Sequence, residues 1–141
     1  MQCNNENVIQ WVNEVASKLQ PDQVVWIDGS EQENDSLCQQ LVSEGVFTRL
    51  NEEFYPNSYW CLSNPNDVAR VEEKTFICAR SEGDAGPTNN WADPKKMYSK
   101  LDDLMKGCMK GRTMYVVPYL MGPDGSQYSK VGFELTDSAY V

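Results

Sequence analysis

The chain has 141 residues and a formal net charge of −9, because 21 acidic side chains outnumber 12 basic ones. Hydrophobic residues make up 40% and charged residues 23%, the balance of an ordinary globular protein rather than of a disordered one. The length predicts a single domain over residues 1–141, and the acidic charge argues against binding to nucleic acid or to an anionic membrane. Histidine is absent, which excludes Ser-His-Asp and Cys-His catalytic groups and histidine metal ligands from these residues.

The first third of the chain predicts a helix, a strand and a second helix. Apolar residues recur at steps of three and four from Val8 to Leu19, which predicts a helix that Pro21 ends. A strand follows at residues 24–27, and a second helix is expected from about residue 33 to residue 43. The side chains that this helix is expected to bury are Leu37, Cys38, Leu41 and Val42. This order of elements favours an α/β or α+β fold.

The middle of the chain predicts two short strands, a long loop and a third helix. The strands are expected at residues 59–62 and 75–78. Residues 80–91 are rich in Gly, Pro, Asp and Asn, which is typical of an exposed loop with no core of its own. Asp93 before Pro94 is a favourable helix start. The side chains that this third helix is expected to bury are Met97, Leu101, Leu104 and Met105.

The last third predicts a β-hairpin. Residues 113–119 and 130–136 have the composition of two strands, and residues 122–126 (GPDGS) supply the turn. The chain stops at Val141 soon after the second strand, which suggests a fragment.

The five cysteines are expected to be buried free thiols in a reducing compartment. They stand at Cys3, Cys38, Cys61, Cys78 and Cys108, and no two have the spacing of a zinc site or a redox pair. The N-terminus lacks the pattern of a signal peptide, and no apolar run approaches the ~20 residues of a membrane span. These features together predict a cytoplasmic protein.

Two segments carry cations that could hold an anion. Arg70 lies between a turn and a strand, where a guanidinium could bind a carboxylate or phosphate through two hydrogen bonds; the alternative is a surface arginine paired with Glu72 or Asp67. Residues 107–113 (GCMKGRT) superficially resemble a phosphate-binding loop. Their spacing is not that of G-x-x-x-x-G-K-[ST], and they precede a strand, so a helix stop followed by a turn is favoured.

Five segments, in this order, resemble the N-terminal region of GTP-dependent phosphoenolpyruvate carboxykinase. They are residues 64–72 (NPNDVARVE), 86–91 (GPTNNW), 107–118 (GCMKGRTMYVVP), 121–123 (MGP) and 134–138 (ELTDS). Residues 27–30 (IDGS) fit the same family, so that the resemblance runs from about Trp26 to the end. Gln127 and Ala139 depart from it, since both stand where the family usually has proline.

The resemblance implies the N-terminal lobe of a bilobed α/β enzyme, with a mixed sheet, flanking helices and a C-terminal β-hairpin. It implies a decarboxylating lyase of gluconeogenesis that converts oxaloacetate and GTP into phosphoenolpyruvate, GDP and CO2 with Mn²⁺ or Mg²⁺. Arg70 matches the family arginine that grips the substrate's carboxylate or phosphate. Glu72 lies in the same strip and is a weaker candidate for positioning the substrate or a closing lid.

The family's nucleotide loop, metal ligands and mobile lid lie further along a longer chain. The resemblance therefore implies that these 141 residues contain no catalytic, cofactor-binding or metal-binding residue and are inactive alone. The expected partners are the small-molecule substrate and the nucleotide-binding remainder of the same polypeptide. The alternative is a stand-alone binding or regulatory module with the same fold and no chemistry.

Overall fold

The computed structural model of the protein describes residues 3–65 and 71–141, which fall into two compact units. Unit 1 combines Met1–Leu62 with Gly107–Val141, and unit 2 is Ser63–Lys106. The helices and strands of unit 1 are α1 (Glu6–Leu19), β1 (Gln23–Trp26), α2 (Glu31–Ser43), β2 (Thr48–Arg49), β3 (Tyr59–Trp60), β6 (Thr113–Met121) and β7 (Lys130–Thr136). Those of unit 2 are η1 (Glu72–Lys74), β4 (Phe76–Ile77), η2 (Glu82–Ala85), β5 (Asn90–Trp91) and α3 (Pro94–Met105).

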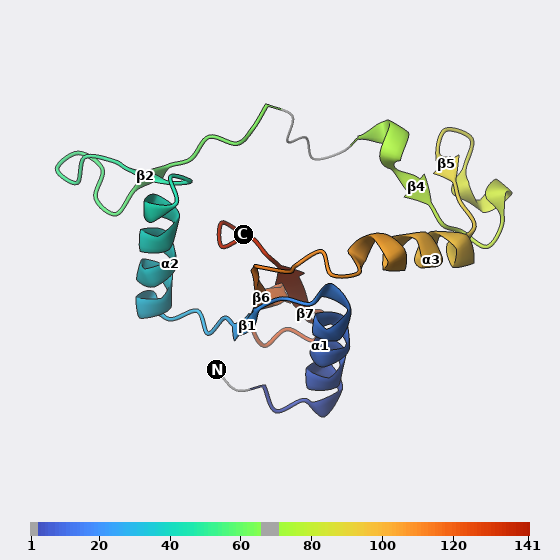
Figure 1. Ribbon diagram of the computed structural model, residues 1–141, viewed down its shortest axis with the longest axis horizontal. Coiled ribbons are helices and arrows are strands. Elements are labelled where there is room, and N and C mark those ends of the chain that lie inside the picture. The colour runs from blue at the N-terminus through green and yellow to red at the C-terminus, as the bar shows by residue number, and fades with distance from the viewer. Residues whose placement is uncertain (1–2, 66–70) are drawn as a thin grey trace. The chain divides into compact units, whose positions relative to one another are not determined.

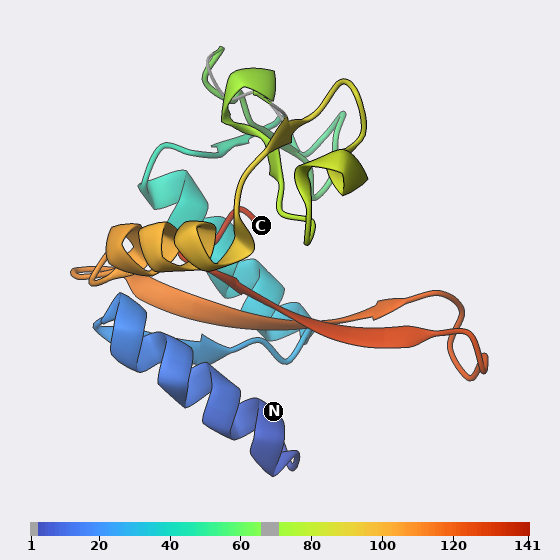
Figure 2. The ribbon, with the colours of Figure 1, turned by 90° about the vertical axis from the view of Figure 1, so that its right-hand side faces the viewer.

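A three-stranded mixed sheet organises unit 1, in the order β1-β6-β7 (Figure 1). β1 pairs with β6 in parallel, and β6 pairs with β7 in antiparallel register, with Val116 opposite Leu135 and Met121 opposite Lys130. The expected mixed α/β fold and the expected hairpin are therefore confirmed. Figure 2 shows the far half of the hairpin extending past the part of the sheet that the helices cover.

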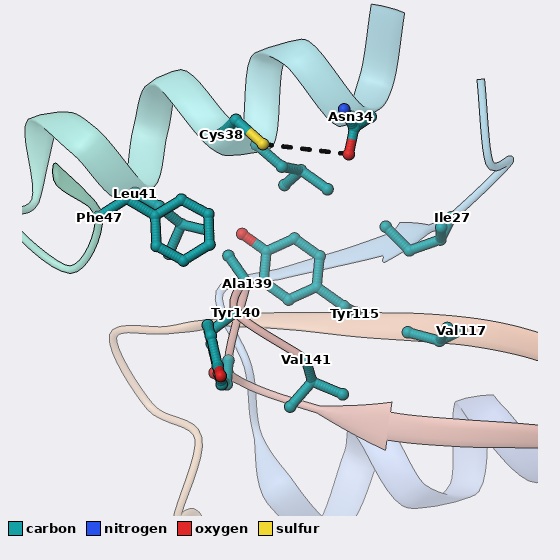
Figure 3. Close-up of a pocket in the computed structure, with 12 residues that line it drawn as sticks. Ile27, Asn34, Cys38, Leu41, Phe47, Tyr115, Val117, Ala139, Tyr140 and Val141 are labelled. Atoms are coloured by element: carbon teal, nitrogen blue, oxygen red, sulfur yellow. Dashed lines mark hydrogen bonds between the residues drawn. The ribbon is translucent and has the colours of Figure 1, made fainter. Parts of the chain in front are cut away.

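The hydrophobic core of unit 1 lies between α1 and one face of the sheet. Met114 and Val116 of β6 are fully buried against Val12 and Leu19 of α1, with Met109 beside them. Because side chains alternate along a strand, Tyr115 and its neighbour Val117 point to the opposite face, toward α2 (Figure 3). The sheet thus separates two helices, and β6 supplies side chains to both of its faces.

Helix α1 begins two residues before the periodic apolar pattern and ends where the sequence predicts. Asn5 caps it, because its side-chain oxygen accepts hydrogen bonds from the backbone N–H groups of Asn7 and Val8. Gln20 closes it in the left-handed conformation, with φ 57°.

Helix α2 also begins two residues earlier than expected, because Ser30 caps it and Glu33 holds the residues before the cap. The Ser30 hydroxyl accepts the Glu33 N–H, and the Glu33 carboxylate accepts the N–H groups of Asp28 and Gly29 at 2.8 and 2.9 Å. The expected burial was wrong in part. Leu41 is buried, but Leu37 and Cys38 are half-buried and Val42 is 37% exposed, because only one narrow stripe of α2 meets the sheet.

Unit 2 has more structure than its turn-rich sequence indicates. β4 and β5 pair in parallel, with Phe76 opposite Asn90 and Ile77 opposite Trp91. The segment 80–91, expected to be a loop without a core, therefore contains η2 and β5, and Ala85 in it is buried. Apart from Ala85 and Trp91 the segment is exposed, as expected. Its short strand was not predicted, because its hydrogen-bonding partners lie in a segment more than ten residues away.

Helix α3 starts as predicted, since the Asp93 side chain accepts the Lys96 N–H at 2.9 Å and Pro94 occupies the first turn. Its expected burial was wrong. Leu101, Leu104 and Met105 are 45%, 66% and 41% exposed, and Met97 is half-buried. The reason is that the strands of unit 2 are short and give the helix little apolar surface to pack against. A shallow hollow lies between Cys78 and the first turns of α3.

The expected burial of the cysteines was also wrong. All five thiols are free, but Cys78 and Cys108 are exposed and the other three are only half-buried. No helix in the described part of the chain is both long enough and apolar enough to cross a membrane.

Candidate functional site

Of the two candidate substrate-binding residues, the structure describes only Glu72. Arg70 lies outside the described residues. Glu72 is described and is the first residue of η1 in unit 2, with an exposed side chain. The site is therefore built from the segment that follows Arg70 in the sequence.

Residues 71–75 form a single tight turn that its own backbone closes. The N–H groups of Lys74 and Thr75 donate to the carbonyl oxygens of Val71 and Glu72, at 3.0 and 3.1 Å. The Thr75 hydroxyl also donates to the Val71 carbonyl, at 2.7 Å. This turn fixes the backbone direction from which the Glu72 carboxylate projects.

A second segment, residues 89–92, holds this turn and the strand after it. The side-chain amide of Asn90 donates to the carbonyl oxygens of Glu72 and Thr75, at 3.0 and 3.3 Å. The indole N–H of Trp91 donates to the Ala79 carbonyl at 3.0 Å. These bonds, together with the pairing of β4 and β5, bring the segment 86–91 against the segment that begins at residue 71.

A polar hollow of about 580 Å³ lies between these two segments. The residues that line it are Glu72, Glu73, Thr75, Thr88, Asn89 and Asn90. Thr75 and Asn90 already donate to backbone carbonyl oxygens, so the donors that remain are the Thr88 hydroxyl and part of the Asn89 amide, beside two carboxylates. The described lining includes no cation. A small anion bound here needs a guanidinium or ammonium group against those carboxylates, and Arg70 precedes Glu72 by two residues.

Unit 1 contains a second hollow, which the sequence did not indicate. It encloses about 260 Å³ between α2, β6 and the last four residues (Figure 3). Its few polar side chains are those of Asn34, Cys38, Tyr115, Ser138 and Tyr140, and Gln40 donates to the Tyr115 hydroxyl at 3.4 Å. Because no charged side chain lines it, it offers packing and weak hydrogen bonds rather than acid–base chemistry. Its only sequence signal is the apolar stripe of α2.

The glycine-rich segment 107–113 is a structural turn, as the sequence favours. Its backbone N–H groups are already used: Gly107 donates to the Lys18 carbonyl, Met109 to the Leu19 carbonyl, and Gly111 to the Asp22 carboxylate at 3.0 Å. Gly107 and Gly111 have φ values of 70° and 77°, which favour glycine. A phosphate-binding loop needs such N–H groups to point at its ligand, so this segment is not one.

Metal ligands do not gather in the described structure. Among residues 3–65 and 71–141, no three side chains of Cys, Asp or Glu lie close enough together to hold a metal ion. The described residues therefore do not fit the Mn²⁺ or Mg²⁺ that the resemblance implies, and no chemical step is assigned to a metal on this chain.

Comparison with known proteins identifies relatives over nearly the whole chain. The family model described as phosphoenolpyruvate carboxykinase N-terminal domain matches residues 10–141. The match extends the resemblance noted in the sequence, which began near Trp26, toward the N-terminus and across most of α1.

Several relatives bear the name phosphoenolpyruvate carboxykinase (GTP). One from Renibacterium salmoninarum is 54% identical over 97% of this chain and 23% of its own length. One from Neocallimastix frontalis is 53% identical over 97% of this chain and 22% of its own length. One from Corynebacterium efficiens is 51% identical over 98% of this chain and 22% of its own length. The chain thus spans less than a quarter of these relatives.

Proposed function

Because this chain belongs to the family of the phosphoenolpyruvate carboxykinase N-terminal domain, we propose that it forms the N-terminal, substrate-binding part of a GTP-dependent phosphoenolpyruvate carboxykinase. The observation that carries the proposal is the 54% identity, over 97% of the chain, to a relative of that name. The complete enzyme converts oxaloacetate and GTP into phosphoenolpyruvate, GDP and CO2 in gluconeogenesis, in the cytoplasm.

Within this enzyme, Arg70 binds the substrate. Oxaloacetate and phosphoenolpyruvate both carry a carboxylate, and phosphoenolpyruvate also carries a phosphate, so both offer the paired oxygens that a guanidinium binds through parallel hydrogen bonds. The polar hollow lined by Glu72 is compatible with this role, because the Thr88 hydroxyl and one hydrogen of the Asn89 amide can donate to an anion there. Its two carboxylates disfavour an anion unless a cation lies beside it. Glu72 has the weaker role of orienting the substrate or a closing segment.

GTP and the divalent metal, Mn²⁺ or Mg²⁺, bind to other parts of the complete enzyme. The sequence contains no G-x-x-x-x-G-K-[ST] segment and no histidine, and the amide groups of residues 107–113 are occupied. The function of this chain is therefore to present the substrate to a nucleotide and metal that the remaining polypeptide holds.

The test is the steady-state kinetics of the complete carboxykinase carrying Arg70→Ala. Loss of one charge-assisted substrate contact costs roughly 2–5 kcal/mol, so kcat/KM for phosphoenolpyruvate should fall by about thirtyfold or more. Arg70→Lys should recover only part of the loss, because an ammonium group cannot form the paired hydrogen bonds.

The matched control is Arg80→Ala, which removes an exposed arginine of the same unit and should leave kcat/KM unchanged. Unchanged kinetics in Arg70→Ala would return Arg70 to the class of surface arginines. If no protein containing this sequence showed carboxykinase activity, the alternative of a binding or regulatory module with the same fold would replace the proposal.

A further inference from the structure

The tripeptide Asp-Gly-Ser occurs twice in the chain, at residues 28–30 and at residues 124–126. The first lies between β1 and α2, and the second lies in the turn between β6 and β7. In both, the aspartate and the glycine are exposed, and the glycine is left-handed, with φ values of 73° and 74°. A Cβ atom added to either glycine would meet nothing within 4 Å. Sequence, exposure and glycine conformation therefore do not distinguish the two tripeptides.

An aspartate followed by glycine can rearrange through a cyclic imide. The glycine nitrogen attacks the side-chain carboxyl carbon, a C–N bond forms, and the carboxyl hydroxyl leaves as water with the amide hydrogen. A water molecule then opens this succinimide ring. Where it breaks the bond to the main-chain carbonyl carbon, the chain continues through the side chain as isoaspartate; where it breaks the new bond, aspartate returns. Glycine favours ring closure, because it has no Cβ to shield its nitrogen or to restrict its backbone.

Hydrogen bonds restrain both reacting groups of the first tripeptide. The Glu33 carboxylate accepts the backbone N–H groups of Asp28 and Gly29, at 2.8 and 2.9 Å. The Asp28 carboxylate accepts the N–H of Ser30 at 2.8 Å. The hydrogen bonds from Ser30, followed by one from Glu33, lower the pKa of Asp28, which favours its ionised form. Ring closure needs a protonated carboxyl group and a nitrogen that is free to turn toward it, so these hydrogen bonds oppose both requirements.

The second tripeptide lacks these restraints. The N–H of Ser126 donates to the carbonyl oxygen of Pro123, at 3.2 Å, and not to the preceding aspartate. In the described part of the chain, neither the Asp124 carboxylate nor the Gly125 N–H has a hydrogen-bonding partner. The turn lies at the tip of the hairpin, away from α1 and α2 (Figure 2). Because exposed loop tips open at little cost in free energy, the Gly125 nitrogen can reach the carboxyl group.

We propose that Asp124 is a site of spontaneous isoaspartate formation, and that the Glu33 carboxylate protects Asp28 from the same reaction. Water is the only co-reactant, and the product has the same composition as the starting chain. Each conversion adds one carbon atom to the main-chain path of the hairpin turn. The proposal does not depend on the proposed function, because neither tripeptide contains a residue to which that function assigns a role.

The first measurement is peptide mapping of the 141-residue chain after long, warm incubation at mildly acidic pH. Isoaspartate is detected by labelling with an isoaspartate-specific methyltransferase and is located by electron-transfer fragmentation. It should form at residue 124 about tenfold faster than at residue 28, as expected when hydrogen bonds must open before Asp28 can react. No isoaspartate at residue 124, or equal rates at the two sites, would overturn the proposal.

Incubation in concentrated guanidinium chloride tests whether the fold causes the difference. Unfolding breaks the hydrogen bonds of both tripeptides, so the two sites should then react at rates within about twofold of each other. If residue 28 remained as slow in the unfolded chain as in the folded one, protection by Glu33 would be excluded. Asp124→Glu should abolish the product at residue 124, because the longer side chain closes a larger ring less readily. Isoaspartate that persisted in that peptide would overturn the assignment.

Substitutions of Glu33 test the protection directly. Glu33→Ala removes the acceptor of the Gly29 N–H, so isoaspartate at residue 28 should form about tenfold faster, while the rate at residue 124 stays unchanged. Glu31→Ala is the matched control, since it removes another carboxylate from the first turn of α2 and should leave both rates unchanged. A wild-type rate at residue 28 in Glu33→Ala, or an equal increase in Glu31→Ala, would overturn the role of Glu33.

A second substitution keeps the test decisive if Glu33→Ala does not fold. Glu33→Gln retains an amide oxygen as acceptor but loses the negative charge, which weakens its hydrogen bonds to the N–H groups of Asp28 and Gly29. The rate at residue 28 should then rise by less than in Glu33→Ala but clearly above that of the wild type. An unchanged rate would again overturn the role of Glu33.

Discussion

Asp28 shows how a single exposed side chain ties a loop to the helix that follows it. Its carboxylate accepts the Ser30 N–H at 2.8 Å, while Glu33 accepts the N–H of Asp28 itself. The hydrogen bonds from Ser30, with a further contribution from Glu33, lower the pKa of Asp28 below its ordinary value of 3.8. A carboxyl group whose pKa is lowered in the folded state stabilises that state when it is ionised.

We therefore predict that Asp28→Asn lowers the free energy of unfolding at neutral pH and that this difference shrinks in acid. The pKa of Asp28 is lower in the folded protein than in the unfolded one. Its contribution to the free energy of unfolding is therefore complete above about pH 4–5, and it is lost as the pH falls through the pKa of the folded state. Urea unfolding of both proteins at several pH values measures the difference. Asp124→Asn, in the hairpin turn, is the control, and a difference independent of pH would contradict the prediction.

At the residue scale, the sequence predicts contacts between neighbours and misses contacts between distant residues. Asp93 was predicted as a helix cap because its partner, Lys96, is three residues away. The hydrogen bonds of the Asn90 side chain were not predicted, since its partners lie 18 and 15 residues away and only the folded chain brings them close. Arg70 lies outside the described residues, and its role stays a prediction.

At the scale of elements, the sequence predicted the long elements and the two-residue strands β3 and β4, but it missed β2 and β5. The helix ending at Leu19 and the hairpin of β6 and β7 each contain enough residues to show a period. β2 and β5 have two residues each, too few for any period, and they exist only because a partner strand is near. The apolar stripe of α3 correctly predicted a helix. A periodic pattern does not show whether another element covers the stripe, so the burial of these side chains could not be predicted from it.

Strand β6 offers a prediction that compares a buried methionine with an exposed one. Met114 is fully buried between α1 and the sheet, whereas Met121, at the far end of the same strand, is 65% exposed. Met114→Ala should lower the free energy of unfolding by about 2–5 kcal/mol, because it removes buried atoms and leaves a cavity.

Met121→Ala should change the free energy of unfolding by less than about 0.5 kcal/mol, since it lies on the surface. Denaturant unfolding followed by circular dichroism measures both variants. Equal effects would mean that the core of unit 1 does not lie against α1.

At the scale of the whole molecule, this chain corresponds to the N-terminal domain of a larger enzyme. The proposed function gives it the guanidinium of Arg70 to bind a small anion, while its net charge of −9 disfavours anions in general. A nucleoside triphosphate needs either a phosphate loop or a metal to overcome that charge. The described residues include no cluster of metal ligands, and the one glycine-rich segment that resembles a phosphate loop uses its N–H groups to hold α1 and Asp22.

We therefore predict that the purified 141-residue chain has no carboxykinase activity. A coupled assay that follows oxaloacetate formation from phosphoenolpyruvate, GDP, bicarbonate and Mn²⁺ should give the rate of the buffer alone, with a complete enzyme of the family as positive control. A ligand that binds the folded state at a hundred times its Kd stabilises that state by about 2.7 kcal/mol, so thermal unfolding provides a second measurement. The unfolding temperature should not rise with GTP and Mn²⁺. GDP-dependent turnover, or a rise in the unfolding temperature with GTP and Mn²⁺, would show that these residues bind the nucleotide.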